Sequence, residues 1–322
     1  MKNIVINSND AGQRLDSFLK KVVPRLPSSL LYKYIRKKRI KINDKRCEIS
    51  QRLNFGDTIN LYINDEFLSE KTNKLDFLYA GNQLNILYED KNILIIDKKP
   101  GLIVHPDKNL QFDCLINRIK KYLYSKNEYN PDLENSFSPA LVNRIDRNTS
   151  GIVMSAKNSQ SLKILNEALK LRHIKKYYLC IVNGKMPKKE DTLKDFLKKD
   201  KRNNKVTIRN NNSYKDKYIQ TKYKVIQEKN NLSLLEIDLL TGRTHQIRAH
   251  LSSIDHPIIG DQKYGNSDIN KIYEYKYQLL CSYKIEFDKF YDLKELNYLK
   301  NKNFQILNPW FLKDFNFNKF IN

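Results

Sequence analysis

The sequence is short of several residue types, and each shortage excludes a class of protein. Only four of its 322 residues are cysteine, at positions 47, 114, 180 and 281. They form no C-x-x-C pair and none has a histidine at zinc-ligand spacing, so neither a disulfide scaffold nor a zinc ribbon is predicted. The N-terminus turns polar within seven residues, and no apolar run approaches the roughly 18 residues of a membrane span. We therefore expect a cytoplasmic protein with free thiols that does not enter a membrane.

Acidic residues are also few in comparison with basic ones. The 36 Asp and Glu residues face 59 Lys and Arg residues, which leaves a net charge of +23 at pH 7. Such an excess indicates a polyanionic partner, with nucleic acid ahead of an anionic membrane surface. The length suits about two domains at roughly 150 residues each.

The sequence also lacks the common nucleotide and metal motifs. It has neither a G-x-x-x-x-G-K loop nor a G-x-G-x-x-G turn, and no serine lies in a G-x-S-x-G elbow. ATP, NAD and Ser-His-Asp chemistry therefore have no support. His245 and His250 are five residues apart, whereas a zinc-binding helical pair needs a spacing of about four. No cofactor and no metal site are predicted.

Residues 1–64 are predicted to form a small αβ module. Apolar residues at helical spacing predict a helix over 13–23 and a second one from Ser28 or Ser29, and short alternating strands are expected at 39–43 and 57–63. Arg36, Lys37 and Lys38 belong to a basic strip over 33–46. This strip suits contact with a phosphate backbone, and the alternative is an ordinary solvated basic face.

A polar linker is expected over 65–85, and a larger domain over 86–322. In this domain the patterns predict strands at 93–96, 152–156, 178–182, 219–226 and 234–240, and helices at 110–124, 159–172 and 244–254. The Lys- and Asn-rich segment 185–217 is interpreted as a mobile basic insertion or a hairpin. The irregular order of helices and strands favours the α+β class over a doubly wound α/β fold.

Two segments of the larger domain are candidates for chemistry. In LVNRIDRNTSG, Asp146 lies between Arg144 and Arg147, whose field favours the carboxylate, so it would be an anionic nucleophile or base. Taken alone it could equally be a surface ion pair. In TGRTHQIRAHL, Thr244 is expected to cap a helix that carries Ile247 on its core face and Arg248 one turn on, a setting that suits a phosphate or a partner carboxylate.

Taken together, the motifs resemble those of a known family. RIDRNTSGIVMSAK and LLTGRTHQIRAHL, with KPGLIVHP upstream, KKYYLCIVNG between them and HPIIGDQKYG after them, are similar in order to the motif series of the RluA-type RNA pseudouridine synthases. The match extends over about residues 93–287. The front module resembles the S-four-type RNA-binding domain that often precedes this catalytic domain, and the pairing supports the resemblance.

The resemblance implies a cofactor-free isomerisation of uridine to pseudouridine in RNA, by a pseudouridine synthase domain with a mixed, mainly antiparallel sheet flanked by helices. Asp146 matches the catalytic aspartate, which either attacks the ribose or removes its carbon-2′ proton. Tyr178 matches the tyrosine that stacks on the base, and Arg248 the arginine that pairs with the aspartate. Arg144 matches the residue that fills the space of the flipped nucleotide, since extruding a base costs a few kcal/mol. Ile247 matches an aliphatic residue beside the pocket, although core packing explains it equally well.

The sequence departs from the family pattern at Asn143, where a histidine is usual, and at Cys281 and Ser282. The expected substrate is large-subunit ribosomal RNA, with transfer RNA as the alternative, and the expected oligomeric state is a monomer. A non-catalytic ribosome-assembly factor is the second hypothesis, which the presence of Asp146, Tyr178 and Arg248 argues against. A DNA-binding regulator could use residues 13–38 but leaves the larger domain unexplained, so no DNA partner is expected.

Overall fold

The computed structural model describes residues 1–68, 74–107, 112–200, 202–203, 205–209 and 216–313. Residues 2–61 form the N-terminal module, in which the described residues make a four-stranded antiparallel sheet of order β1-β4-β2-β3. Its elements are β1 (Lys2–Val5), α1 (Leu15–Val22), α2 (Ser28–Arg36), β2 (Ile40–Ile42), β3 (Lys45–Arg46) and β4 (Thr58–Leu61). The predicted helix pair and strands are present, and β1 and β3 are additions that the sequence did not predict.

The second part of the chain is built on one large mixed sheet, which contains 11 strands among the described residues, in the order β11-β10-β12-β13-β9-β14-β8-β6-β5 with β15 and β7 at its sides. The strands are β5 (Ile86–Glu89), β6 (Ile93–Lys98), β7 (Ala140–Leu141), β8 (Ser150–Ala156), β9 (Ile174–Asn183), β10 (Glu190–Asp200), β11 (Lys205–Arg209), β12 (Lys217–Lys229), β13 (Leu232–Asp238), β14 (Leu280–Phe287) and β15 (Asn303–Gln305). Within the described ranges only β14 and β8 pair in parallel, which confirms the predicted α+β fold with a mainly antiparallel sheet.

Helices cover both faces of this sheet. On one face, α4 (Ser159–Lys170) and the short helix η3 (Lys294–Leu299) pack against one hydrophobic core. On the other, α3 (Leu115–Ser125) and α5 (Gln246–Ser252) pack against a second core. A further helix, α6 (Ser267–Tyr273), follows α5. None of the described helices has the length and apolar character needed to span a bilayer.

Three local predictions are corrected or completed by the structure. Segment 185–217 contributes the hairpin of β10 and β11, so the hairpin interpretation holds where the chain is described. The helix predicted from 244 begins at Gln246 and is preceded by His245, not capped by Thr244, because His245 adopts the left-handed conformation with a φ of 53°. The helix predicted from 110 begins at Leu115, and positions 110 and 111 lie outside the described residues.

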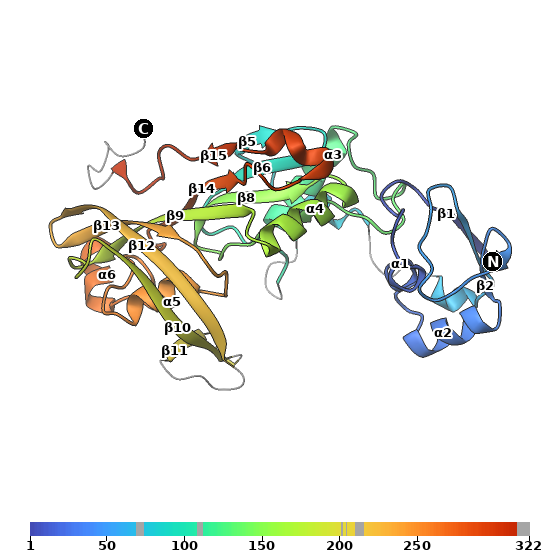
Figure 1. The fold of residues 1–322 in the computed structure, drawn as a ribbon, viewed down its shortest axis with the longest axis horizontal. Helices are drawn as coiled ribbons and strands as arrows, with labels where there is room; N and C mark the ends of the chain where they lie inside the picture. Colours follow the sequence, from blue (N-terminus) through green and yellow to red (C-terminus); the bar gives the residue numbers. More distant parts are fainter. Residues whose placement is uncertain (69–73, 108–111, 201, 204, 210–215, 314–322) are drawn as a thin grey trace.

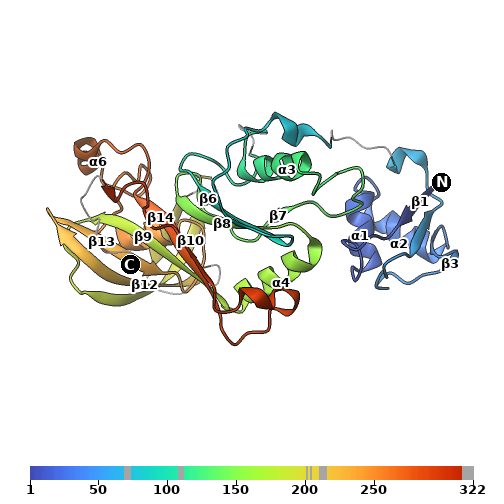
Figure 2. The ribbon, with the colours of Figure 1, turned by 90° about the horizontal axis from the view of Figure 1, so that it is seen from above.

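The N-terminal module and the β10–β12 end of the large sheet lie at opposite ends of the molecule (Figures 1 and 2). Between them, polar side chains of segment 133–136 contact the module loop 7–13. Ser136 and Asn135 donate hydrogen bonds to the two carboxylate oxygens of Asp10 at 2.6 and 2.7 Å. Asn9 accepts a 3.0 Å bond from the backbone N–H of Ser159 at the start of α4. In the segment predicted as a linker, η2 (Asp76–Tyr79) packs Phe77 into the core of the large sheet.

Candidate active site

A cleft of about 880 Å³ brings together the larger domain's candidate residues. Asp146, Tyr178 and Arg248 line it, together with Arg144 and Ile247, although these residues are up to 104 positions apart in the sequence (248 − 144). Its walls come from the loop before β8, from β9 and from α5 with the turn that precedes it. Arg36, Lys37 and Lys38 lie elsewhere, at the exposed C-terminal end of α2 in the N-terminal module.

The loop that carries Asp146 is held by buried polar groups on both sides. The Nζ of Lys98 donates to the carbonyl oxygens of Arg147, Lys99 and Leu102, each at 2.9 Å. On the other side, the side-chain amide of Gln278 donates to the hydroxyl of Thr149 at 2.8 Å. Since Lys98 and Gln278 are each 1% exposed, these bonds are shielded from water and fix the loop.

Asn143, at the position where the family usually has histidine, anchors the start of the same loop. Its side-chain amide donates to the carbonyl of Ile152 at 3.1 Å and accepts from the N–H of Met154 at 2.7 Å. The asparagine thus satisfies two backbone groups of β8 and holds the start of the loop in place of the usual histidine.

Arg248 is hydrogen-bonded to two carboxylates. Its Nη1 donates to Oδ2 of Asp146 at 2.7 Å, and its Nε and Nη2 donate to Oδ2 and Oδ1 of Asp261 at 2.7 and 2.9 Å. Burial alone would raise the pKa of Asp261, but the bonds from Arg248 and from the N–H groups of Lys263 and Tyr264 hold it below its ordinary value. Burial would also lower the pKa of Arg248, yet the two carboxylates keep it above its usual value. Arg248 is therefore a permanent cation aimed at Asp146.

Arg248, and neither of the two arginines that flank Asp146 in the sequence, supplies the cation that contacts its carboxylate. The Nε of Arg147 donates to the carbonyl of Gly101 at 3.1 Å, while Arg144 is exposed and lines the cleft. Asp146 itself retains 25% of its side-chain exposure. The carboxylate is thus neutralised from the side of α5 and remains open to the cleft, which is unlike the isolated surface pair considered from the sequence.

Tyr178 and Ile247 form the apolar part of the cleft. Both are 5% exposed and belong to the same hydrophobic core, so Ile247 combines core packing with a position on the cleft wall. Burial raises the pKa of Tyr178 well above its ordinary value, and the Asp146 carboxylate adds to this effect. The phenol is consequently protonated at neutral pH and presents an aromatic surface beside the carboxylate.

The rim of the cleft is basic. Lys176, Lys199, Arg243 and Lys263 line it with Arg144 and Arg147. Burial, aided by Arg172, lowers the pKa of Lys176 to about 8. An acidic group surrounded by cations suits a reaction on a polyanion, because the cations hold the phosphates while the carboxylate acts on the sugar or base.

Sequence reasoning missed three groups that shape this site. Asp261 follows a glycine in a turn that reads as surface, Lys98 is one of two adjacent lysines, and His245 was considered only as a metal ligand. The described part of the chain contains no cluster of three or more His, Cys, Asp or Glu side chains that would hold a metal.

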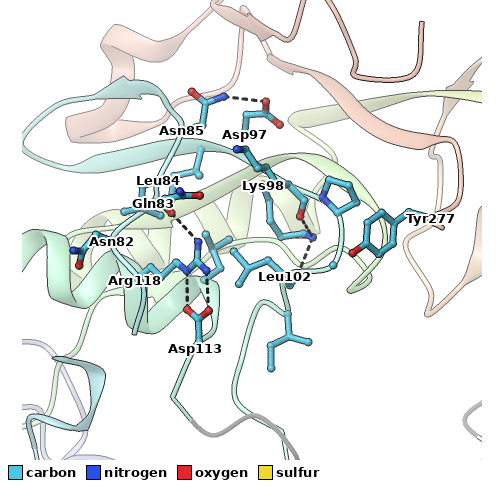
Figure 3. A pocket seen from close by; sticks show the side chains of 16 residues that line it. Asn82, Gln83, Leu84, Asn85, Asp97, Lys98, Leu102, Asp113, Arg118 and Tyr277 are labelled. Atoms are coloured by element: carbon cyan, nitrogen blue, oxygen red, sulfur yellow. Dashed lines mark hydrogen bonds and ion pairs between the residues drawn. The ribbon is translucent and has the colours of Figure 1, made fainter. Parts of the chain in front are cut away.

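Figure 3 shows a second pocket, of about 740 Å³, which Lys98 also lines. Lys98 and the turn 99–102 line it, and Arg118 makes a two-point ion pair with Asp113 at 2.7 and 2.8 Å on its opposite side. Lys98 connects this pocket to the Asp146 loop through its bond to the carbonyl of Arg147.

Comparisons with known proteins agree with this geometry. Residues 92–253 match the family model described as RNA pseudouridylate synthase. A protein of Mycoplasma capricolum with the name uncharacterized RNA pseudouridine synthase is 37% identical over 314 residues, which cover 94% of this chain and 96% of that protein. The ribosomal large subunit pseudouridine synthase C of Buchnera aphidicola from Schizaphis graminum is 34% identical and covers 83% of this chain and 82% of its own.

The fold has a counterpart among solved structures. Human RNA pseudouridylate synthase domain containing 4 superposes with a TM-score of 0.55 over 71% of this chain and 90% of its own, at 21% identity. The chain therefore belongs to the RNA pseudouridine synthases, in the RluA-type family, and is an isomerase that acts on RNA.

Proposed function

We propose that this enzyme converts uridines of large-subunit ribosomal RNA to pseudouridine in the cytoplasm, with Asp146 as the catalytic carboxylate. The observation that carries the proposal is the state of Asp146 in the cleft. Arg248 engages its Oδ2, and within the described part of the chain Oδ1 makes no hydrogen bond. One oxygen is fixed and the other is available to the ribose of a uridine in the cleft.

The remaining candidate residues have complementary roles in this proposal. Tyr178 stacks on the extruded uracil, and Arg248 holds Asp146 in one orientation through the bond to its Oδ2. Arg144 is exposed at the rim, where it can occupy the space that the flipped nucleotide leaves, which offsets part of the few kcal/mol that extrusion costs. Ile247 packs beside the base.

The names of relatives support ribosomal RNA over transfer RNA, and the basic strip supports RNA contact outside the cleft. Relatives at 34 and 35% identity have the name ribosomal large subunit pseudouridine synthase C. The N-terminal module presents Arg36, Lys37 and Lys38 on one exposed strip at the end of α2, which would contact phosphates outside the cleft. The four cysteines are buried and unpaired, as suits a reducing cytoplasm.

Expression in cells without their own large-subunit pseudouridine synthases tests the proposal. Pseudouridine is mapped across total RNA by carbodiimide labelling and primer extension, for the natural chain and for Asp146→Asn. We expect stops in large-subunit RNA that disappear in Asp146→Asn, while RNA affinity stays within a few fold, because asparagine keeps an oxygen for Arg248. Asp268→Asn, which removes an exposed ion pair with Lys271, is the matched control and should keep the stops.

The outcomes separate the alternatives. Stops confined to transfer RNA would mean that the enzyme makes pseudouridine but that its substrate is transfer RNA. Product formation by Asp146→Asn would remove this residue from the mechanism. If RNA binds tightly and no Asp146-dependent stop occurs in any RNA, the protein acts as an assembly factor on this scaffold.

A further inference from the structure

His245 holds an unusual backbone conformation next to Asp146. Its φ of 53° lies in the left-handed region, which is uncommon for a residue with a side chain and often marks a functional constraint. This conformation ends the approach to α5 and turns the imidazole toward the cleft, where its ring is one of the lining groups.

The ring is held on one side by Tyr264. The Nδ1 of His245 lies 2.9 Å from the Tyr264 hydroxyl, and the two rings meet edge to face at 5.6 Å. The same hydroxyl accepts a 2.8 Å bond from the backbone N–H of Val206 in β11. A phenol has one proton, and because this oxygen already accepts from Val206, donating that proton to Nδ1 would complete the contact.

This arrangement favours one tautomer of His245. With Nδ1 as acceptor, the neutral ring carries its own proton on Nε2. Burial lowers the pKa of His245, although the Asp146 carboxylate opposes this effect, so the ring is neutral at pH 7. The Nε2 atom lies 3.9 Å from Oδ2 of Asp146, which is the oxygen that Arg248 already contacts.

We propose that His245 is a positioning residue that holds Oδ2 of Asp146 through its Nε2–H, with Tyr264 and the β11 backbone setting its tautomer. This inference rests on the proposed role of Asp146. The 3.9 Å separation is longer than a hydrogen bond, and such contacts often shorten when the substrate is bound. Arg248 and His245 together would confine rotation of the carboxylate, so that Oδ1 faces the ribose.

Replacing His245 with glutamine and with asparagine distinguishes a donor role from a purely conformational one. Glutamine places its NH₂ close to the position of Nε2 and can still donate to Asp146, whereas asparagine reaches only as far as Nδ1. Asparagine is the better tolerated of the two at positive φ. A purely conformational role for His245 therefore predicts that His245→Asn equals or exceeds His245→Gln, and a donor role predicts the opposite order.

The experiment measures kcat and KM by tritium release from RNA that carries uridine labelled at carbon 5. We expect His245→Gln to keep kcat within about threefold and His245→Asn to lose roughly tenfold or more, a usual size for a lost aligning contact, with KM unchanged within twofold in both. Tyr264→Phe should lower kcat in the same way. Tyr283→Phe, which removes a buried hydroxyl bonded to Glu236, is the control and should leave kcat unchanged.

Nitrogen NMR of the five histidines reads the tautomer without reference to activity. We expect His245 as the Nε2–H form in the natural chain and a loss of this preference in Tyr264→Phe. An Nδ1–H tautomer in the natural chain, or His245→Asn at least as active as His245→Gln, would overturn the inference. Turnover by Asp146→Asn would instead overturn the proposed function, so the two failures are distinguishable.

Discussion

Arg248 and Asp261 form a two-point ion pair, 2.7 and 2.9 Å between the bonded atoms, in which the Asp261 side chain is fully buried. The pair stands behind Asp146 and leaves only Nη1 of Arg248 to face it. The position of the candidate catalytic carboxylate is thus set by a residue outside the cleft wall. These three bonds fix the guanidinium of Arg248 between the two carboxylates.

Replacing Asp261 with asparagine should damage both stability and turnover. Asparagine keeps one acceptor but leaves the buried guanidinium with a single carboxylate. Breaking a buried pair of this kind costs about 3–5 kcal/mol of unfolding free energy, and we expect kcat to fall while RNA affinity changes little. Urea unfolding and tritium release check this prediction. Asp268→Asn serves as the exposed control, and equal losses in the two variants would contradict it.

Lys98 should make the stability of the protein depend on pH. Burial lowers the pKa of Lys98 to about 7, against the opposing effect of the Asp146 and Asp97 carboxylates, from an ordinary value of 10.5. Between pH 7 and 10.5 the unfolded chain keeps a proton that the folded chain has released, so the unfolding free energy rises with pH by up to about 1.4 kcal/mol per unit. Below pH 7 both the folded and the unfolded chain hold the proton, so Lys98 no longer makes the unfolding free energy depend on pH.

The measurement is urea unfolding of the natural chain and of Lys98→Met at pH 7, 8 and 9. Lys98→Met should be less stable overall, since the three carbonyl oxygens lose the amine that they contact, which has three N–H groups when protonated and two when neutral. The difference between the two chains should grow with pH. Parallel curves would show that Lys98 keeps its proton when folded.

Gly151 lies where β8 runs beside β14. A Cβ there would be 2.3 Å from the carbonyl oxygen of Ser282, and its φ is 112°. Gly151→Ala must therefore separate the parallel pair, and we expect a loss of at least about 3 kcal/mol or failure to fold. Gly56→Ala is the matched control, since Gly56 also has a positive φ of 84° but nothing within 4 Å of its Cβ. That change should cost only about 1 kcal/mol.

The basic strip of the N-terminal module should act through charge alone. Replacing Arg36, Lys37 and Lys38 with alanine should weaken RNA binding and flatten its salt dependence by roughly 0.7–0.9 in slope per lost contact. Affinity is measured from about 50 to 300 mM salt and compared with a triple variant of the exposed residues Lys170, Lys289 and Lys294. An identical slope for the natural chain and the strip variant would mean that these charges face only solvent.

Local patterns predicted much of the fold, and the failures have physical causes. The apolar spacing of Leu162, Leu165 and Leu169 predicted α4, which extends over Ser159–Lys170. The β1 strand was missed because Lys2–Val5 is mostly exposed and is fixed by pairing with β4, 57 or so positions away. Thr244 looked like a helix cap, but His245 takes the left-handed turn that begins α5.

The site shows the same division. The motifs pointed to Asp146, Tyr178 and Arg248, and the structure brings all three into one cleft. Asp261 and Lys98 were not predicted, because each looks like a surface charge until the tertiary fold buries it. Burial of a charge depends on chain segments far apart in the sequence, which no local spacing reveals.

Two bonds that hold the Asp146 loop can form only after a long stretch of the later chain has been synthesised. The hydroxyl of Thr149 accepts its hydrogen bond from Gln278, which lies 129 positions further along the chain. The hydroxyl of Ser150 donates to the carbonyl of Leu280 at 3.3 Å, across 130 positions. A ribosome that adds ~5–20 residues per second needs roughly 6 to 26 s for that stretch. Throughout this interval the nascent chain carries Asp146 on a loop without these two bonds. Asp146 is therefore synthesised several seconds before its loop can form these two bonds.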